Sequence, residues 1–97
     1  MMYKVQFTVD LTTGNQCTFC TPGFTLMEDA ALYGFRCARS EDFPRSVGDD
    51  PPYFTLDCSC LVIRTPDPAM VEYVSARTLP MTDEETQNYH AIRQHLS

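Results

Sequence analysis

The sequence predicts a small α+β domain in the order ββαββα, with an antiparallel sheet and a central helix packed on one of its faces. Three patterns carry this prediction: apolar and polar residues alternate strictly over 3–11, the segment 25–39 is amphipathic, and a second apolar run covers 53–64. The 97 residues with 43% apolar content suit one globular core. We therefore treat 1–97 as a single domain.

The first strand is the clearest element of the chain. Its apolar side chains share one face and its polar side chains the other, which is typical of a half-buried strand. The apolar set is Tyr3, Val5, Phe7, Val9 and Leu11. The turn-forming residues 12–15, which include Gly14, then reverse the chain into a hairpin.

The returning strand is predicted to be short. It covers 16–21, with Cys17 and Phe19 facing the core. Pro22 and Gly23 follow, and both residues commonly interrupt strands. We expect the strand to end there.

The central helix is predicted over 25–39 with a capping box at its start. Thr25 and Glu28 stand three residues apart, so each side chain could accept a hydrogen bond from the other's backbone N–H. The predicted apolar face consists of Leu26, Met27, Ala30, Ala31, Tyr33, Gly34, Cys37 and Ala38. Because most of these residues are small, the helix can lie close to the sheet.

The second half of the chain is predicted to hold a long charged loop, two strands and a helix. The loop covers 41–52, the strand over 53–64 is apolar on both faces near its end, and β-branched and aromatic residues favour a fourth strand over 69–79. A second capping box opens a helix over 82–96. Its apolar stripe is only Tyr89, Ile92 and Leu96, so we expect it to be weakly anchored.

The charge of the chain disfavours several classes of partner. Thirteen acidic against seven basic residues give a net charge of −6, which repels nucleic acids and anionic membranes. No run approaches the roughly 20 apolar residues of a membrane span. The first residues alternate like a strand and lack the apolar block of a signal peptide. We expect a cytoplasmic protein without direct nucleic-acid or membrane binding.

The five cysteines allow two interpretations. Cys17 and Cys20 have the C-x₂-C spacing of a zinc knuckle, and Cys58 and Cys60 could supply a second pair for a tetrahedral site. A strand would, however, point Cys17 and Cys20 to opposite faces, and inward cysteines are also ordinary small core residues. We predict no cofactor, with Cys20 pointing away from the core and accessible. A zinc-stabilised or thiol-redox domain is the alternative.

No catalytic constellation is found in the sequence. His90 and His95 are five residues apart and do not share a helix face, so they do not form a zinc-binding pair. The sequence has no phosphate-cradling glycine loop and no nucleophile elbow. We predict that the chain is not an enzyme.

The outer face of the central helix is the candidate binding surface. Leu32 lies at its centre and Phe35 at its border, surrounded by the charged residues Glu28, Asp29, Arg36 and Arg39. Apolar anchors among arginines are common at interface hot spots. Alternatively, the loop could fold back and cover Leu32 with Phe43 or Val47.

The second face of the sheet offers another candidate patch, formed by Tyr53, Leu61, Ile63 and Tyr73. A homodimer could bury either surface. Small acidic domains without a catalytic motif resemble, as a general type, the inhibitors and adaptors of phages and mobile elements, including anti-restriction and anti-CRISPR proteins. We therefore predict a non-catalytic interaction domain that docks on a larger protein complex, such as one that handles nucleic acid, in the host cytoplasm if the chain is phage-encoded.

Overall fold

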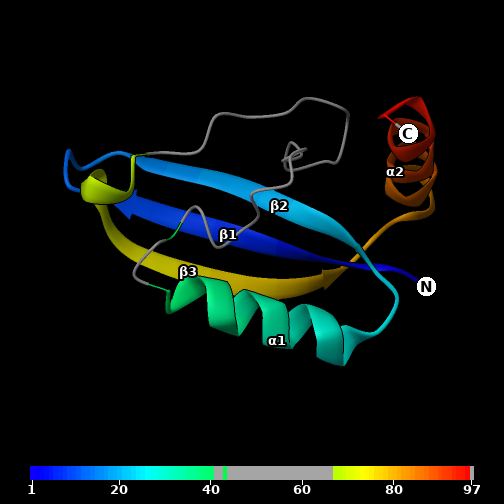
Figure 1. The fold of residues 1–97 in the computed structure, drawn as a ribbon, viewed down its shortest axis with the longest axis horizontal. Helices are drawn as coiled ribbons and strands as arrows, with labels where there is room; N and C mark the ends of the chain where they lie inside the picture. Colours follow the sequence, from blue (N-terminus) through cyan, green and yellow to red (C-terminus); the bar gives the residue numbers. More distant parts are fainter. Residues whose placement is uncertain (41–42, 44–66, 97) are drawn as a thin grey trace.

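The computed structural model of the chain describes residues 1–40, 43 and 67–96 (Figure 1). Its elements, in order, are β1 (Tyr3–Leu11), β2 (Gln16–Phe24), α1 (Met27–Ala38), the short 3-10 helix η2 (Pro68–Met70), β3 (Val71–Pro80) and α2 (Asp83–Leu96). The chain has an α+β fold with an antiparallel sheet and two helices. The predicted strand over 53–64 and nearly all of the predicted loop over 41–52 lie outside the described residues.

β1 is the middle strand of the described sheet, whose order is β2-β1-β3 with both pairs antiparallel. The alternation expected from the sequence is present, because Val5, Phe7 and Val9 are fully buried on the face that α1 covers. β3 confirms the strand predicted over 69–79. It pairs with β1 so that Phe7 lies opposite Ala76.

β2 is longer than predicted, because it continues through Pro22 to Phe24. Proline lacks a backbone N–H and is tolerated at the border of a sheet, where β2 lies among the described strands. The pairing shifts by one residue between Tyr3 and Lys4 of β1, so that Gly23 is skipped. Gly23 takes a φ of 98°, a conformation that glycine adopts without a steric penalty. The prediction that this dipeptide ends the strand was wrong.

α1 packs on the sheet through small side chains, as the sequence indicates. Ala30, Gly34 and Cys37 are its buried residues. At Gly34 the backbone is so close to the sheet that a Cβ atom would lie 2.9 Å from Cγ1 of Val5 and 3.2 Å from Cβ of Ala76. Gly34 therefore lies over the boundary between β1 and β3.

The start of α1 differs from the prediction in two ways. The N-cap residue is Leu26, in extended backbone, and it makes no side-chain capping bond, so Thr25 does not cap the helix. Leu26 and Met27 are 54% and 58% exposed instead of buried. The cause is the longer β2: with the strand running to Phe24, the chain is still extended where the sequence pattern expects a helical turn.

The second capping box is confirmed. The backbone N–H of Thr82 donates to Oε1 of Glu85 at 3.0 Å, and the backbone N–H of Glu85 donates to Oγ1 of Thr82 at 3.1 Å. The other carboxylate oxygen of Glu85 pairs with the ammonium of Lys4 on β1. The first turn of α2 is therefore tied to the middle strand.

α2 also closes a small second core on the sheet face opposite α1. Cys20 of β2 is fully buried there with Met81, and Met2, Tyr89 and Ile92 pack around them. Lys4 and Cys20 lie on this face because they alternate with the residues that α1 covers. None of the described helices is long and apolar enough to cross a membrane.

Candidate functional site

The structure places all six residues of the predicted binding surface on the exposed side of α1. These residues, which we call the outer face of α1, are Glu28, Asp29, Leu32, Phe35, Arg36 and Arg39. Leu32 is 50% exposed and Phe35 58%. Two large apolar side chains thus lie in water at the middle of the face, where burial would remove apolar area from solvent.

Charge is distributed along this face from one end to the other. Glu28 and Asp29 lie in the first turn of α1, and Arg36 lies in the last turn. The negative charges stabilise the N-terminal end of the helix dipole, and the positive charge stabilises its C-terminal end. None of these three residues forms an ion pair with another described residue. Their charges are therefore available to a partner molecule as well as to the helix.

Arg39 and Phe35 form a stacked pair at one border of the outer face. The guanidinium carbon of Arg39 lies 4.9 Å from the centroid of the Phe35 ring, within the range of a cation–π interaction. The contact orients both side chains while more than half of Phe35 stays exposed. Such a pre-ordered aromatic–arginine pair loses less side-chain freedom when a partner covers it.

Phe43 does not cover Leu32, contrary to one of the alternatives considered from the sequence. Phe43 is only 3% exposed and packs in the main core, with its ring centroid 5.4 Å from that of Phe7. Val47, the other residue considered as a cover, lies outside the described residues.

The exposed apolar surface of α1 is larger than the sequence suggested. Leu26 and Met27 extend it at the N-terminal end of the helix. Helical periodicity alone assigns both to the buried face, so it misses them. The signal that could have found them is the hairpin, since a β2 strand equal in length to β1 reaches Phe24.

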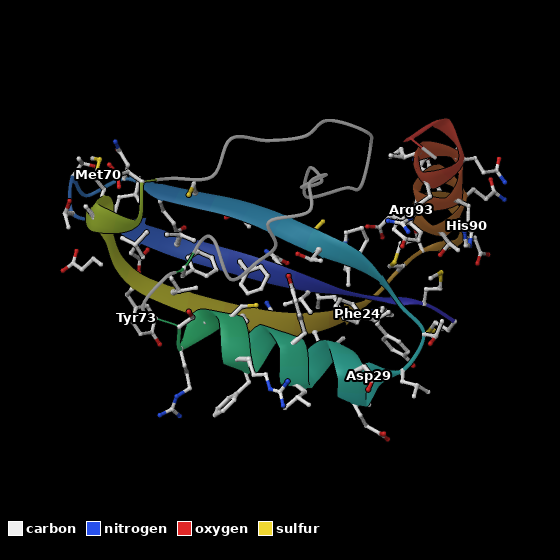
Figure 2. The ribbon with its side chains drawn as sticks, viewed as in Figure 1. Phe24, Asp29, Met70, Tyr73, His90 and Arg93 are labelled. Carbon is white, nitrogen blue, oxygen red and sulfur yellow. The ribbon has the colours of Figure 1, made fainter. Side chains whose placement is uncertain are left out.

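A groove separates α1 from the outer edge of β3. Ala31, Phe35 and Ala38 line its helix side, and Val74, Ser75 and Ala76 line its strand side. Tyr73, which is 63% exposed, stands at the start of β3 beside the C-terminal end of α1 (Figure 2). Tyr53, Leu61 and Ile63, the other members of that predicted patch, lie outside the described residues.

The cysteines Cys17 and Cys20 lie on opposite faces of the sheet. Cys17 is paired with Val9 and packs at the main core, whereas Cys20 is paired with Gln6 and lies in the second core. Burial raises the pKa of the Cys17 thiol, which disfavours the reactive thiolate. The expectation that Cys20 is accessible was wrong, because α2 covers that face.

Of the four cysteines in the alternative zinc site, only Cys17 and Cys20 belong to the described part of the chain. Within that part, no group of three or more His, Cys, Asp or Glu residues is arranged to hold a metal ion. Cys58 and Cys60 lie outside the described residues, so the absence of a cofactor stays a prediction and a zinc site that includes them stays its alternative.

Comparisons of the chain with protein-family models, curated proteins and solved structures found no match. A small α+β fold by itself hosts many unrelated functions. Function must therefore be inferred from the surface chemistry described above, in which the outer face of α1 is the most distinctive feature.

Proposed function

We propose that the chain is a non-catalytic protein-interaction domain that uses the outer face of α1 to dock on a larger protein, as an inhibitor or adaptor. The observation that carries the proposal is the exposure of Leu32 and Phe35 beside Arg36 and Arg39. Single exposed apolar residues are ordinary on a protein surface. Apolar anchors clustered with arginines are instead typical of the centre of an interface.

The net charge of −6 suggests the chemistry of the partner. An acidic protein is attracted to a basic surface, such as that of a cytoplasmic complex that handles nucleic acid. Electrostatic attraction of this kind acts mainly on the association rate. Raising the salt concentration from low to physiological should therefore slow association markedly and change dissociation much less.

The test uses a paired substitution at the outer face and a matched control. The site variant is Leu32→Ser with Arg36→Glu, and the control is Met70→Ser with Arg93→Glu. Met70 is 38% exposed and Arg93 is exposed on α2, and both lie away from α1 (Figure 2). Each variant replaces one exposed apolar side chain by serine and one arginine by glutamate, so a general effect of charge or hydrophobicity should appear in both.

The immobilised wild-type chain is used to capture its partner from extracts of the source or host cell, and the captured protein is then titrated with each variant. We expect the site variant to bind at least ~30-fold more weakly, about 2 kcal/mol, and the control to bind like wild type. Both should keep their stability within ~0.5 kcal/mol. Equal binding by the site variant and the control would reject the outer face of α1 as the docking surface.

A further inference from the structure

α1 does not lie centrally on the described sheet but along its β3 side (Figure 1). One flank of the helix is packed inward, where Tyr33 contacts Phe7 and Phe24, with ring centroids 6.3 Å and 5.3 Å away. The opposite flank carries Ala31 and Phe35, which are both exposed and face the groove above β3. One side of the helix therefore has no described neighbour.

β3 forms a border of the described sheet, since only β1 pairs with it among the described strands. About half of the backbone N–H and C=O groups of a border strand point away from the sheet and can pair with another strand. The middle of β3 holds the small residues Ser75 and Ala76. Ser75 and Ala76 on the strand, with Ala31 on the helix flank, leave room for a second backbone to approach.

We propose that the border of β3 pairs antiparallel with β3 of a second copy of this chain, about a two-fold axis near Ser75. The flanks of the two α1 helices then pack against each other over the joined strands. This surface overlaps the outer face of α1 at Phe35 and Arg39, which line the groove, whereas Leu32 and Arg36 do not line it. The dimer does not depend on the proposed function.

The position of α1 suits this arrangement. Gly34 lies over the boundary of β1 and β3, so the helix is about half a strand spacing, ~2.4 Å, inside β3. A second β3 would lie ~4.8 Å further out, which sets the two helices ~9–10 Å apart. Helices pack against each other at ~8–10 Å. One two-fold axis can therefore satisfy both the strand pairing and the helix packing.

In this arrangement, charged residues of one copy also lie beside residues of opposite charge in the other copy. A two-fold axis perpendicular to the sheet makes the two α1 helices antiparallel and keeps them on the same side. The acidic end of one helix, with Glu28, then lies beside the basic end of the other, with the partner's Arg39. Pairing about Ser75 also sets Tyr73 across from the partner's Arg77, where a cation can contact a ring.

Sedimentation equilibrium of the full chain at micromolar concentrations tests the proposal, together with charge reversals. Glu28→Arg and Arg39→Glu each place like charges together at two symmetry-related positions, so each should weaken the dimer at least tenfold. The double variant exchanges the two charges and should return the dissociation constant to within about threefold of wild type. Glu84→Arg and Arg93→Glu, at exposed positions of α2, are the matched controls and should dimerise like wild type.

Hydrogen exchange provides the second measurement. Amides of β3 should become better protected as the protein concentration rises, while those of α2 should not change. A monomer at all concentrations would overturn the proposal. If β3 is then protected independently of concentration, another part of the same chain, such as the predicted strand over 53–64, occupies the border. If the wild-type chain dimerises but the double variant does not recover the wild-type dissociation constant, that result would also contradict this interface.

Discussion

Gly34 offers the most direct test of how α1 packs. Replacing a helical glycine by alanine ordinarily stabilises a helix by ~1 kcal/mol. Here the added Cβ would lie 2.9 Å from Cγ1 of Val5 and 3.2 Å from Cβ of Ala76, closer than side chains normally approach. Overpacking of this kind costs ~1–3 kcal/mol. The two effects oppose each other, and we expect Gly34→Ala to lower the free energy of unfolding by about 1 kcal/mol.

Urea unfolding measures this change, with two comparisons that separate its parts. Arg36→Ala and Arg36→Gly, at an exposed position of the same helix, give the local difference in helix propensity. Gly34→Ala is then repeated in a Val5→Ala background, where the nearer of the two contacts is absent. In that background the propensity should dominate, so Gly34→Ala should be neutral or stabilising by up to ~1 kcal/mol.

A simple result would contradict this close packing of α1. Suppose that Gly34→Ala raises the free energy of unfolding of the wild-type chain by as much as Arg36→Ala exceeds Arg36→Gly. The added methyl group then meets no obstacle. α1 would then lie further from the sheet, and the estimate of the helix separation in the proposed dimer would fail with it.

Two further predictions concern the helix starts and the pH dependence of stability. Thr82→Ala should cost ~1 kcal/mol because it removes a capping bond, whereas Thr25→Ala should stay within ~0.5 kcal/mol because Thr25 makes none; urea unfolding of the two variants compares them directly. Burial raises the pKa of Glu85, but its bonds to Lys4 and Thr82 outweigh that effect and hold the pKa below its ordinary value. The stability that these bonds provide is present above the ordinary glutamate pKa of about 4.3 and is lost as the pH falls through the lowered pKa of Glu85. Melting temperatures measured against pH should therefore fall less steeply on the acid side for Glu85→Gln than for wild type. Glu84→Gln, at an exposed position, should leave that profile unchanged.

The two capping boxes show where local sequence is sufficient and where it is not. Thr25 and Thr82 begin the same pattern, but only Thr82 caps a helix. Before Thr82, the N–H of Met81 donates to the carbonyl of Met2, which fixes the chain as it leaves β3. Before Thr25, pairing with β1 keeps the backbone extended to Phe24. The deciding contacts are between residues far apart in the sequence, so a pattern of four residues cannot reveal them.

Cys20 shows that local sequence is equally insufficient to predict the burial of a strand residue. Alternation correctly places Cys20 on the face away from Val5, because side-chain direction in a strand is a local property. Whether that face meets water or another element is decided by α2, whose Tyr89 and Ile92 reach back over β2. The thin apolar stripe of the last helix indicated weak anchoring, yet its two partly buried side chains cover one small residue together with Met81 and Met2.

The outer face of α1 could be predicted because helical periodicity alone sets Leu32 opposite the buried Ala30 and Gly34. The flank of α1 that faces the groove could not be predicted from the sequence, because its exposure depends on where the helix lies across the sheet. The two surfaces share Glu28, Phe35 and Arg39, which the dimer would engage. A two-fold axis perpendicular to the sheet leaves Leu32 and Arg36 of both copies uncovered and on the same side, so a dimer would present these two parts of the outer face together. A larger assembly with repeated sites could then be held by both faces at once, and the second contact would be intramolecular and strengthened by its effective concentration.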